Sequence, residues 1–199
     1  MTTGRPAVFF DRDGTLNEEV EFLSAPEQLR LIPGAGRAVR AVNDEGMLAI
    51  VISNQSGIAR GKLTEADLVP IHAKLQKELG TSGARIDRIY YCPHHPTEGI
   101  PPYRVDCDCR KPRPGMLRRA EKELGVDLQS SYVIGDKIVD VLAGRNAGAK
   151  GILVLTGYGG SSVAECREKG VVPDYTAPSV VEAVQFIVNE RRGVPTENV

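Results

Sequence analysis

Short continuous apolar runs alternate with helix-like segments along the whole of this sequence. Each run ends in polar residues or glycine, as strands buried in a parallel sheet do, and the segments between the runs carry apolar residues at helical spacing. A parallel sheet covered by helices on both faces is therefore predicted. The predicted strands cover residues 7–10, 48–52, 86–92, 132–135 and 151–155, and the predicted helices lie between 33 and 46 and over about 64–79, 114–124, 138–147 and 179–190.

The length of 199 residues suits a single domain, which we place at residues 1–190, and we expect the tail 191–199 to be frayed. With 25 basic and 26 acidic residues, the balanced charge gives no reason to expect nucleic acid or an anionic membrane as a partner. No run reaches the roughly 18 apolar residues of a membrane span. No signal-peptide segment precedes the first strand, so a cytoplasmic location is predicted. No long exposed apolar stripe is evident, so we expect a monomer.

Two carboxylates follow the first predicted strand, which ends at Phe10. Asp11 lies where that strand meets the carboxyl edge of the sheet, the edge at which open α/β sheets bind their ligands, and Asp13 lies in the turn that follows. Such a pair can divide the work of phosphoryl transfer, because one carboxylate can attack phosphorus while holding Mg²⁺ and the other can move a proton. By itself the motif also fits an ordinary Asx turn.

Polar residues follow two further predicted strands, and in a parallel sheet they reach the same edge as Asp11. Asp136 comes directly after the strand that ends at Gly135. Oxygen ligands from Asp11 and Asp136, with a main-chain carbonyl near Asp13, suit octahedral Mg²⁺. The strand at 48–52 is followed by groups that can hydrogen-bond phosphate oxygens or other parts of a substrate: Ser53, Asn54 and Gln55.

Cysteines and histidines bracket a loop, residues 92–109, that has no helical or strand periodicity. Cys92 and His94 lie at its start and Cys107 and Cys109 at its end, which makes a closed tetrahedral set for a structural Zn²⁺. His95 can replace His94 as the nitrogen ligand. We call residues 92–109 the zinc loop, and a loop of this length needs such an anchor in a compact domain.

Two cations emerge directly from the zinc loop. Lys111 offers a compact charge to a phosphoryl group, and Arg110 offers a planar fork to a second anionic or polar group of the substrate. The remaining cysteine, Cys166, and the histidine of the 64–79 helix, His72, are expected to be ordinary packing or surface residues.

Taken in order, residues 11–15, 53–55, 111 and 135–137 resemble the four motifs of the haloacid dehalogenase superfamily of phosphatases. The resemblance covers nearly the whole chain. It is strongest to the D-glycero-D-manno-heptose 1,7-bisphosphate 7-phosphatases, through the strings NQSGIARG at 54–61, YYCPHHP at 90–96 and CDCRKP at 107–112. This resemblance implies a Rossmann-like parallel sheet without a large cap domain, in which loops supply substrate selectivity.

The resemblance also implies a role for individual residues. Asp11 would be the nucleophile that forms an aspartyl-phosphate, and Asp13 would be the general acid/base. Ser53 and Lys111 would hold the phosphoryl group. The substrate contacts would come from Asn54, Arg110 and Lys137, the Mg²⁺ ligands from Asp11, Asp13 through its main chain, and Asp136, and the Zn²⁺ ligands from Cys92, His94, Cys107 and Cys109.

The function expected from the sequence is Mg²⁺-dependent removal of the C7 phosphate from a heptose 1,7-bisphosphate. The substrate is thus a small sugar bisphosphate, and the product would feed ADP-heptose or GDP-heptose synthesis for lipopolysaccharide or related glycans. One alternative is a histidinol-phosphate phosphatase, which shares the zinc loop and the Cys-Arg-Lys-Pro segment. A different class, a non-catalytic zinc-loop interaction module, is disfavoured by the balanced charge and by the absence of a basic face with aromatic platforms.

Overall fold

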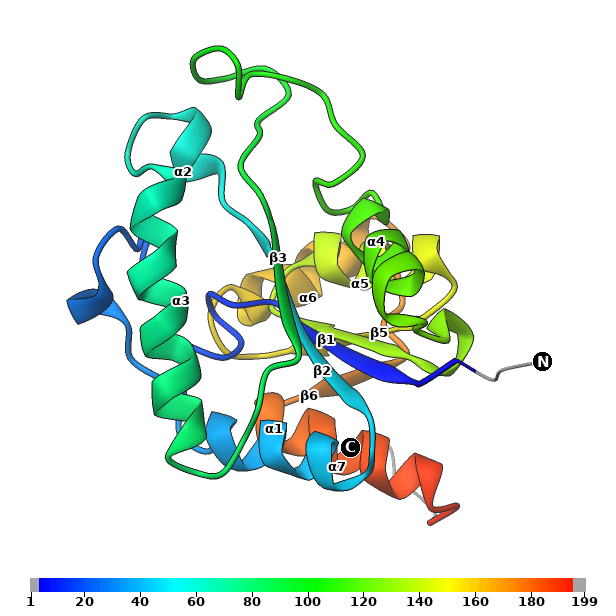
Figure 1. Ribbon diagram of the computed structural model, residues 1–199. Helices are drawn as coiled ribbons and strands as arrows, with labels where there is room; N and C mark the ends of the chain where they lie inside the picture. Colours follow the sequence, from blue (N-terminus) through cyan, green and yellow to red (C-terminus); the bar gives the residue numbers. More distant parts are fainter. Residues whose placement is uncertain (1–3, 195–199) are drawn as a thin grey trace.

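A single parallel sheet of six strands forms the centre of the molecule, in the order β3-β2-β1-β4-β5-β6. The computed structural model describes residues 4–194. Figure 1 shows the sheet nearly edge-on, with helices on either side. The strands are β1 (Ala7–Phe10), β2 (Leu48–Asn54), β3 (Arg88–Cys92), β4 (Tyr132–Gly135), β5 (Lys150–Val154) and β6 (Tyr175–Ala177).

The strands are buried because alternate side chains enter two separate apolar layers. On β1, Val8 and Phe10 pack in one layer, whereas Ala7 and Phe9 pack in the other. All four side chains are fully buried, which explains why β1 is an uninterrupted apolar run in the sequence. The parallel sheet covered on both faces is confirmed.

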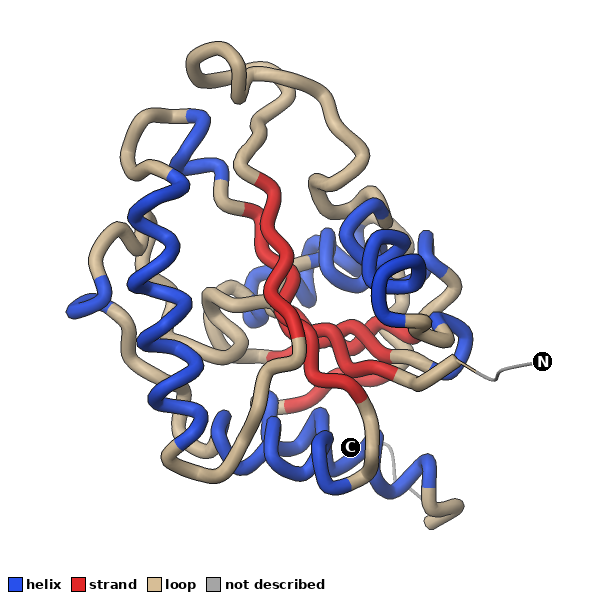
Figure 2. The backbone as a smooth tube through the Cα atoms, viewed as in Figure 1, coloured by secondary structure: helices blue, strands red, loops and turns tan. Residues whose placement is uncertain are grey.

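Helices cover both faces of the sheet (Figures 1 and 2). The first layer contains apolar residues of α1, α3 and α7, and the second contains those of α4 and α5. Apolar residues of α5, α6 and β5 form a smaller third cluster. The helices are α1 (Ala35–Asp44), α2 (Ser56–Ala59), α3 (Glu65–Gly80), α4 (Gly115–Leu124), α5 (Ile138–Ala147), α6 (Gly159–Glu168) and α7 (Val180–Arg191), with 3₁₀ turns at Pro26–Gln28 and Leu128–Ser130.

The helix α3 begins at Glu65, close to the predicted start, although it contains Pro70 in its second turn. Its first turn is fixed by a capping box, because the Thr64 hydroxyl accepts from the main-chain N–H of Asp67 and the Asp67 carboxylate accepts from that of Thr64. Pro70 lies on the exposed face of the helix. The buried face consists of Leu68, Ile71, Leu75 and Leu79.

Three elements, α2, α6 and β6, are additional to the predicted helices and strands. Strand β6 is short and only one of its side chains is buried, so it carries no apolar run. At the start of the tail that we expected to be frayed, Arg191 belongs to α7 and the main-chain N–H of Val194 donates to the carbonyl of Asn189. The rest of the predicted frayed tail, 195–199, lies outside the described residues. Within residues 4–194, no helix is long and apolar enough to cross a bilayer.

The chain order places the site at β1. The chain runs from β1 outward through β2 to β3, and then returns to the other side of β1 with β4. The connections that leave the strands on either side of such a switch point run to opposite faces of the sheet, which leaves a crevice for ligands. No cap domain covers this edge among residues 4–194, and the zinc loop rises above it (green in Figure 1).

Candidate active site and metal-binding cluster

The predicted catalytic side chains come from the carboxyl ends of three neighbouring strands. Asp11 follows β1 and its main-chain N–H donates to the carbonyl of Ile134 in β4 at 2.8 Å. Ser53 is the second-last residue of β2, and Asp136 follows β4. All three side chains are buried. The parallel register therefore brings together residues that are far apart in the sequence.

Lys111 reaches this edge from the zinc loop. Its Nζ lies 2.7 Å from Oδ1 of Asp11 and 2.6 Å from Oδ1 of Asp140, and it donates to the carbonyl of Ile52 at 2.9 Å. Although burial lowers the pKa of Lys111, the two carboxylates outweigh it and raise that pKa. The lysine is therefore a fixed positive charge beside the predicted nucleophile.

Asp11, Asp136 and Asp140 form a buried carboxylate cluster with one oxygen of each within 4.8 Å of the others. Burial raises the pKa of Asp11 to about 7 and that of Asp136 to about 6, because their negative charges are poorly solvated and repel each other. Oδ1 of Asp136 is buried without a hydrogen-bond partner. A hard dication would compensate this concentration of carboxylate oxygens, so the residues fit Mg²⁺.

Two glycines make room for the Asp136 carboxylate. A Cβ on Gly14 would lie 2.2 Å from Oδ2 of Asp136, and one on Gly157 would lie 2.3 Å from it. Both glycines have positive φ, at 82° and 57°. The main-chain N–H of Tyr158 donates to the same oxygen at 2.8 Å. The cluster therefore depends on the loop after β5 as well as on β1 and β4.

Asp13 lies at the same edge, with each carboxylate oxygen accepting two hydrogen bonds. Oδ1 accepts from Arg12 Nε and Asn17 Nδ2, and Oδ2 accepts from Arg12 Nη2 and Gln55 Nε2, at 2.8–3.0 Å. Burial raises the pKa of Asp13, but the Arg12 guanidinium and these hydrogen bonds outweigh burial and lower it. The carboxylate is thus held in one orientation in its ionised form.

The predicted substrate contacts fall into two groups. Gln55 lines the cavity and donates hydrogen bonds to Asp13 and Ser53. Asn54 also lines the cavity; it accepts from the main-chain N–H of Lys111 and donates to the main-chain carbonyl of Lys111. Both residues therefore hold other residues of the site in place. Lys137 also lines the cavity and donates to Glu19 at 3.1 Å. Arg110 instead donates to the carbonyl of His94 at 3.1 Å and does not line it.

The cavity measures about 360 Å³ and opens above the carboxylates. Several residues of the cavity wall could not be predicted from the sequence, because they lie in turns without a recognisable pattern. Asp140 is an exception, since it lies in the first turn of α5, directly after the strand end that carries Asp136. The additional wall residues include Glu19, Phe22, Arg60, Tyr158 and Asp140.

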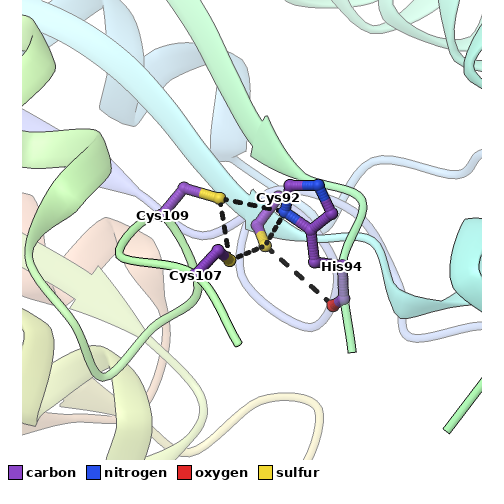
Figure 3. A group of neighbouring side chains, drawn as sticks. All are labelled: Cys92, His94, Cys107 and Cys109. Carbon is purple, nitrogen blue, oxygen red and sulfur yellow. Dashed lines mark hydrogen bonds between the residues drawn. The ribbon is translucent and has the colours of Figure 1, made fainter. Parts of the chain in front are cut away.

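The zinc-loop residues Cys92, His94, Cys107 and Cys109 converge as predicted (Figure 3). The Sγ atoms of Cys92 and Cys107 are 3.5 Å apart, those of Cys107 and Cys109 are 3.1 Å apart, and Nδ1 of His94 lies 3.4 Å from Sγ of Cys109. A tetrahedral zinc site with Zn–S bonds of about 2.3 Å has ligand atoms about 3.8 Å apart, so this set fits zinc.

The open choice between the two histidines is decided by the structure. His94 points into the thiol cluster, whereas Nδ1 of His95 accepts from the main-chain N–H groups of Thr97 and Glu98. Cys166 is buried on α6 and packs with Val141 and Leu153, in agreement with the packing role expected for it.

The tip of the zinc loop docks on α2. The main-chain N–H of Ile100 donates to the carbonyl of Ala59 at 2.9 Å, and a Cβ on Gly99, which has a φ of 95°, would lie 2.2 Å from that carbonyl oxygen. Glu98 pairs with Arg60 of the cavity wall at 2.8 Å. The metal cluster therefore holds a loop that is connected to the wall of the cavity.

Comparisons with known proteins agree with this architecture. Residues 108–183 match the model of the HAD-hydrolase-like family. The chain is 44% identical over 154 residues to a D-glycero-β-D-manno-heptose-1,7-bisphosphate 7-phosphatase of Pasteurella multocida, covering 77% of this chain and 83% of that protein. It is 40% identical over 185 residues to the protein of the same name from Haemophilus ducreyi, covering 92% and 99%.

A solved structure is similar over nearly the full length. The D,D-heptose 1,7-bisphosphate phosphatase of B. bronchiseptica, complexed with magnesium and phosphate, is 31% identical and superposes with a TM-score of 0.81. The match covers 93% of this chain and 99% of that structure.

Proposed function

The chain belongs to the heptose 1,7-bisphosphate 7-phosphatase family of HAD-like hydrolases, and from that membership we propose that it removes the C7 phosphate from D-glycero-D-manno-heptose 1,7-bisphosphate. The observation that carries the proposal is the meeting of Asp11, Asp13, Lys111 and Asp136 at one sheet edge below a cavity. A sugar bisphosphate is a small polar substrate, and the wall of this cavity is rich in charged and polar side chains.

Asp11 is the nucleophile in this proposal. One of its carboxylate oxygens forms a bond to the phosphorus of the C7 phosphate while the bond from phosphorus to the sugar oxygen breaks. Asp13, which takes up a proton from solvent when the substrate binds, gives that proton to the departing oxygen, so the sugar leaves as an alcohol. In the second step Asp13 takes a proton from water as the water oxygen attacks the aspartyl-phosphate, which releases phosphate and regenerates Asp11.

Charge compensation makes these steps possible in a site that already holds several carboxylates. Lys111 is placed beside Asp11 and can pair with phosphoryl oxygens, and the Ser53 hydroxyl can donate to them. When bound by Asp11, Asp136 and the main chain at Asp13, Mg²⁺ would neutralise the charge of the phosphoryl group. The zinc set serves a structural purpose, because four protein ligands leave no open position.

Histidinol-phosphate phosphatase is the nearest alternative. The relatives named above carry the heptose name, which favours the heptose bisphosphate as substrate. We propose that the protein acts as a monomer in the cytoplasm.

The proposal is tested by measuring phosphate release, with Mg²⁺ present, from heptose 1,7-bisphosphate, fructose 1,6-bisphosphate and histidinol phosphate. The heptose bisphosphate should have the highest kcat/KM and should lose one phosphate per molecule, from C7. Asp11→Asn should abolish release from all substrates without altering the circular dichroism spectrum. A preference for histidinol phosphate, or full activity in Asp11→Asn, would contradict the proposal.

A further inference from the structure

Arg12 is the largest fully buried side chain of the described residues, with an exposed fraction of 0%. A buried guanidinium is costly unless its charge is compensated. Its compensation comes from Asp13, which accepts from Nε at 3.0 Å and from Nη2 at 2.8 Å. This two-point contact fixes the orientation of the carboxylate, because a guanidinium is rigid and planar.

The third nitrogen of the guanidinium contacts His72 of α3. Nη1 of Arg12 lies 3.4 Å from Nε2 of His72. Burial, together with the positive charge of Arg12, lowers the pKa of His72 to about 4, so the ring is neutral at pH 7 and Nε2 can accept from Nη1. The ring of Tyr91 also packs against His72, with centroids 5.9 Å apart. His72 was expected to be an ordinary packing or surface residue, and the structure places it half-buried against Arg12.

The four hydrogen bonds to Asp13 differ in their position relative to the cavity. A carboxylate has about four acceptor sites, and here all four are occupied. Arg12 and Asn17 are fully buried and do not line the cavity, whereas Gln55 does. The donor that can be displaced by a substrate is therefore Gln55, and the oxygen it bonds is Oδ2.

We propose that Arg12 is a positioning residue, held by His72, that presents Oδ2 of Asp13 to the leaving oxygen of the substrate at the place that Gln55 occupies in the free enzyme. The inference rests on the proposed function, since it assigns the proton-transfer atom of that reaction. When the substrate displaces Gln55, Oδ2 takes up a proton from solvent. It gives this proton to the departing sugar oxygen as the bond to phosphorus breaks, and it takes a proton from the attacking water in the second step. Arg12 and Asn17 keep their contacts throughout.

The test compares two leaving groups in Arg12→Lys and in Asp13→Asn. A sugar alkoxide needs a proton to leave, whereas p-nitrophenolate leaves without one. Single-turnover rates of leaving-group release should be measured for heptose 1,7-bisphosphate and for p-nitrophenyl phosphate, so that only transfer to Asp11 contributes. In Arg12→Lys the rate with the sugar should fall by about 10- to 100-fold, and the rate with p-nitrophenyl phosphate by less than about 3-fold. Asp13→Asn should show the same pattern more strongly.

Substitutions of His72 provide a second test that keeps the buried arginine. His72→Gln retains an acceptor for Nη1 and should retain the wild-type ratio of the two rates. His72→Leu removes the acceptor and should lower the rate with the sugar selectively. Arg118→Lys, an exposed arginine of α4, is the matched control and should leave both rates unchanged.

Two results would overturn the inference. The first is an equal loss with both substrates in Arg12→Lys and His72→Leu, because a merely structural role lowers both rates together. The second is an unchanged ratio in Arg12→Lys when Asp13→Asn changes it. A wild-type enzyme that cleaves neither substrate would instead contradict the proposed function.

Discussion

Nζ of Lys111 lies 2.7 Å from Oδ1 of Asp11 although 100 residues separate them in the sequence. Lys111 lies two residues after the zinc loop and Asp11 follows β1, so this contact joins the base of the loop to the sheet edge. The buried ammonium group of Lys111 also stabilises the fold, because it compensates the negative charges of Asp11 and Asp140, which are shielded from solvent.

Lys111→Met should lower kcat with the heptose bisphosphate by about 100-fold or more, because a donor to the phosphoryl group is lost. It should also lower the free energy of unfolding by about 3 kcal/mol in the absence of Mg²⁺, because Asp11 and Asp140 lose their compensating charge. Steady-state kinetics and urea denaturation measure the two effects. Lys62→Met, an exposed lysine, serves as the control. Wild-type kcat in Lys111→Met would remove this lysine from the reaction.

Asp140→Asn separates the charge of Asp140 from its role at the start of α5. The asparagine oxygen can still accept from the main-chain N–H of Lys137, as Oδ2 does at 3.0 Å, but it no longer pairs ionically with Lys111. The Mg²⁺ concentration needed for half-maximal activity should rise by about 10- to 100-fold. Asp127→Asn, at the start of a 3₁₀ turn away from the site, is the matched control. An unchanged Mg²⁺ dependence would exclude Asp140 from the metal environment.

Removal of zinc should release the zinc loop at its base. Chelation should lower the thermal midpoint and reduce kcat/KM, since Lys111 and the Glu98–Arg60 pair both depend on where this loop lies. Metal analysis should find one zinc per chain in the wild type and none in Cys107→Ser, whereas Cys166→Ser should keep its zinc. A zinc-free protein with an unchanged thermal midpoint and rate would refute the structural role.

His72 should make the protein less stable in mild acid. The unfolded imidazole binds a proton below its usual pKa of 6.5, whereas the folded ring resists protonation until about pH 4. Its contribution to stability is therefore complete above pH 6.5 and declines as the pH falls from 6.5 to 4, by about 3 kcal/mol. Thermal midpoints measured across this range should fall less steeply in His72→Gln. If the thermal midpoints of the wild type and of His72→Gln fall equally with pH, His72 does not contribute to the loss of stability in acid.

Local patterns in the sequence were sufficient for the main architecture and for most of the predicted site. The apolar run of β1 and the polar residues after it identify a buried strand that ends at a site, because burial on both faces demands an uninterrupted run. Paired cysteines with a histidine at short spacing identify the zinc cluster, because ligand chemistry is specific. The strand β6 could not be identified in this way, since three residues with one buried side chain leave no periodic signal.

The order of residues along the chain shows which side chains are able to react, whereas their contacts depend on how the chain packs in three dimensions. Asp140 meets Lys111, His72 meets Arg12, and Arg110 turns to the main chain of His94 rather than to the cavity. Strand formation depends on residues that are close together in the sequence, so the pattern of apolar residues predicts it. Contacts between side chains depend on the register of the sheet and on how loops and helices pack over it, which no local pattern contains.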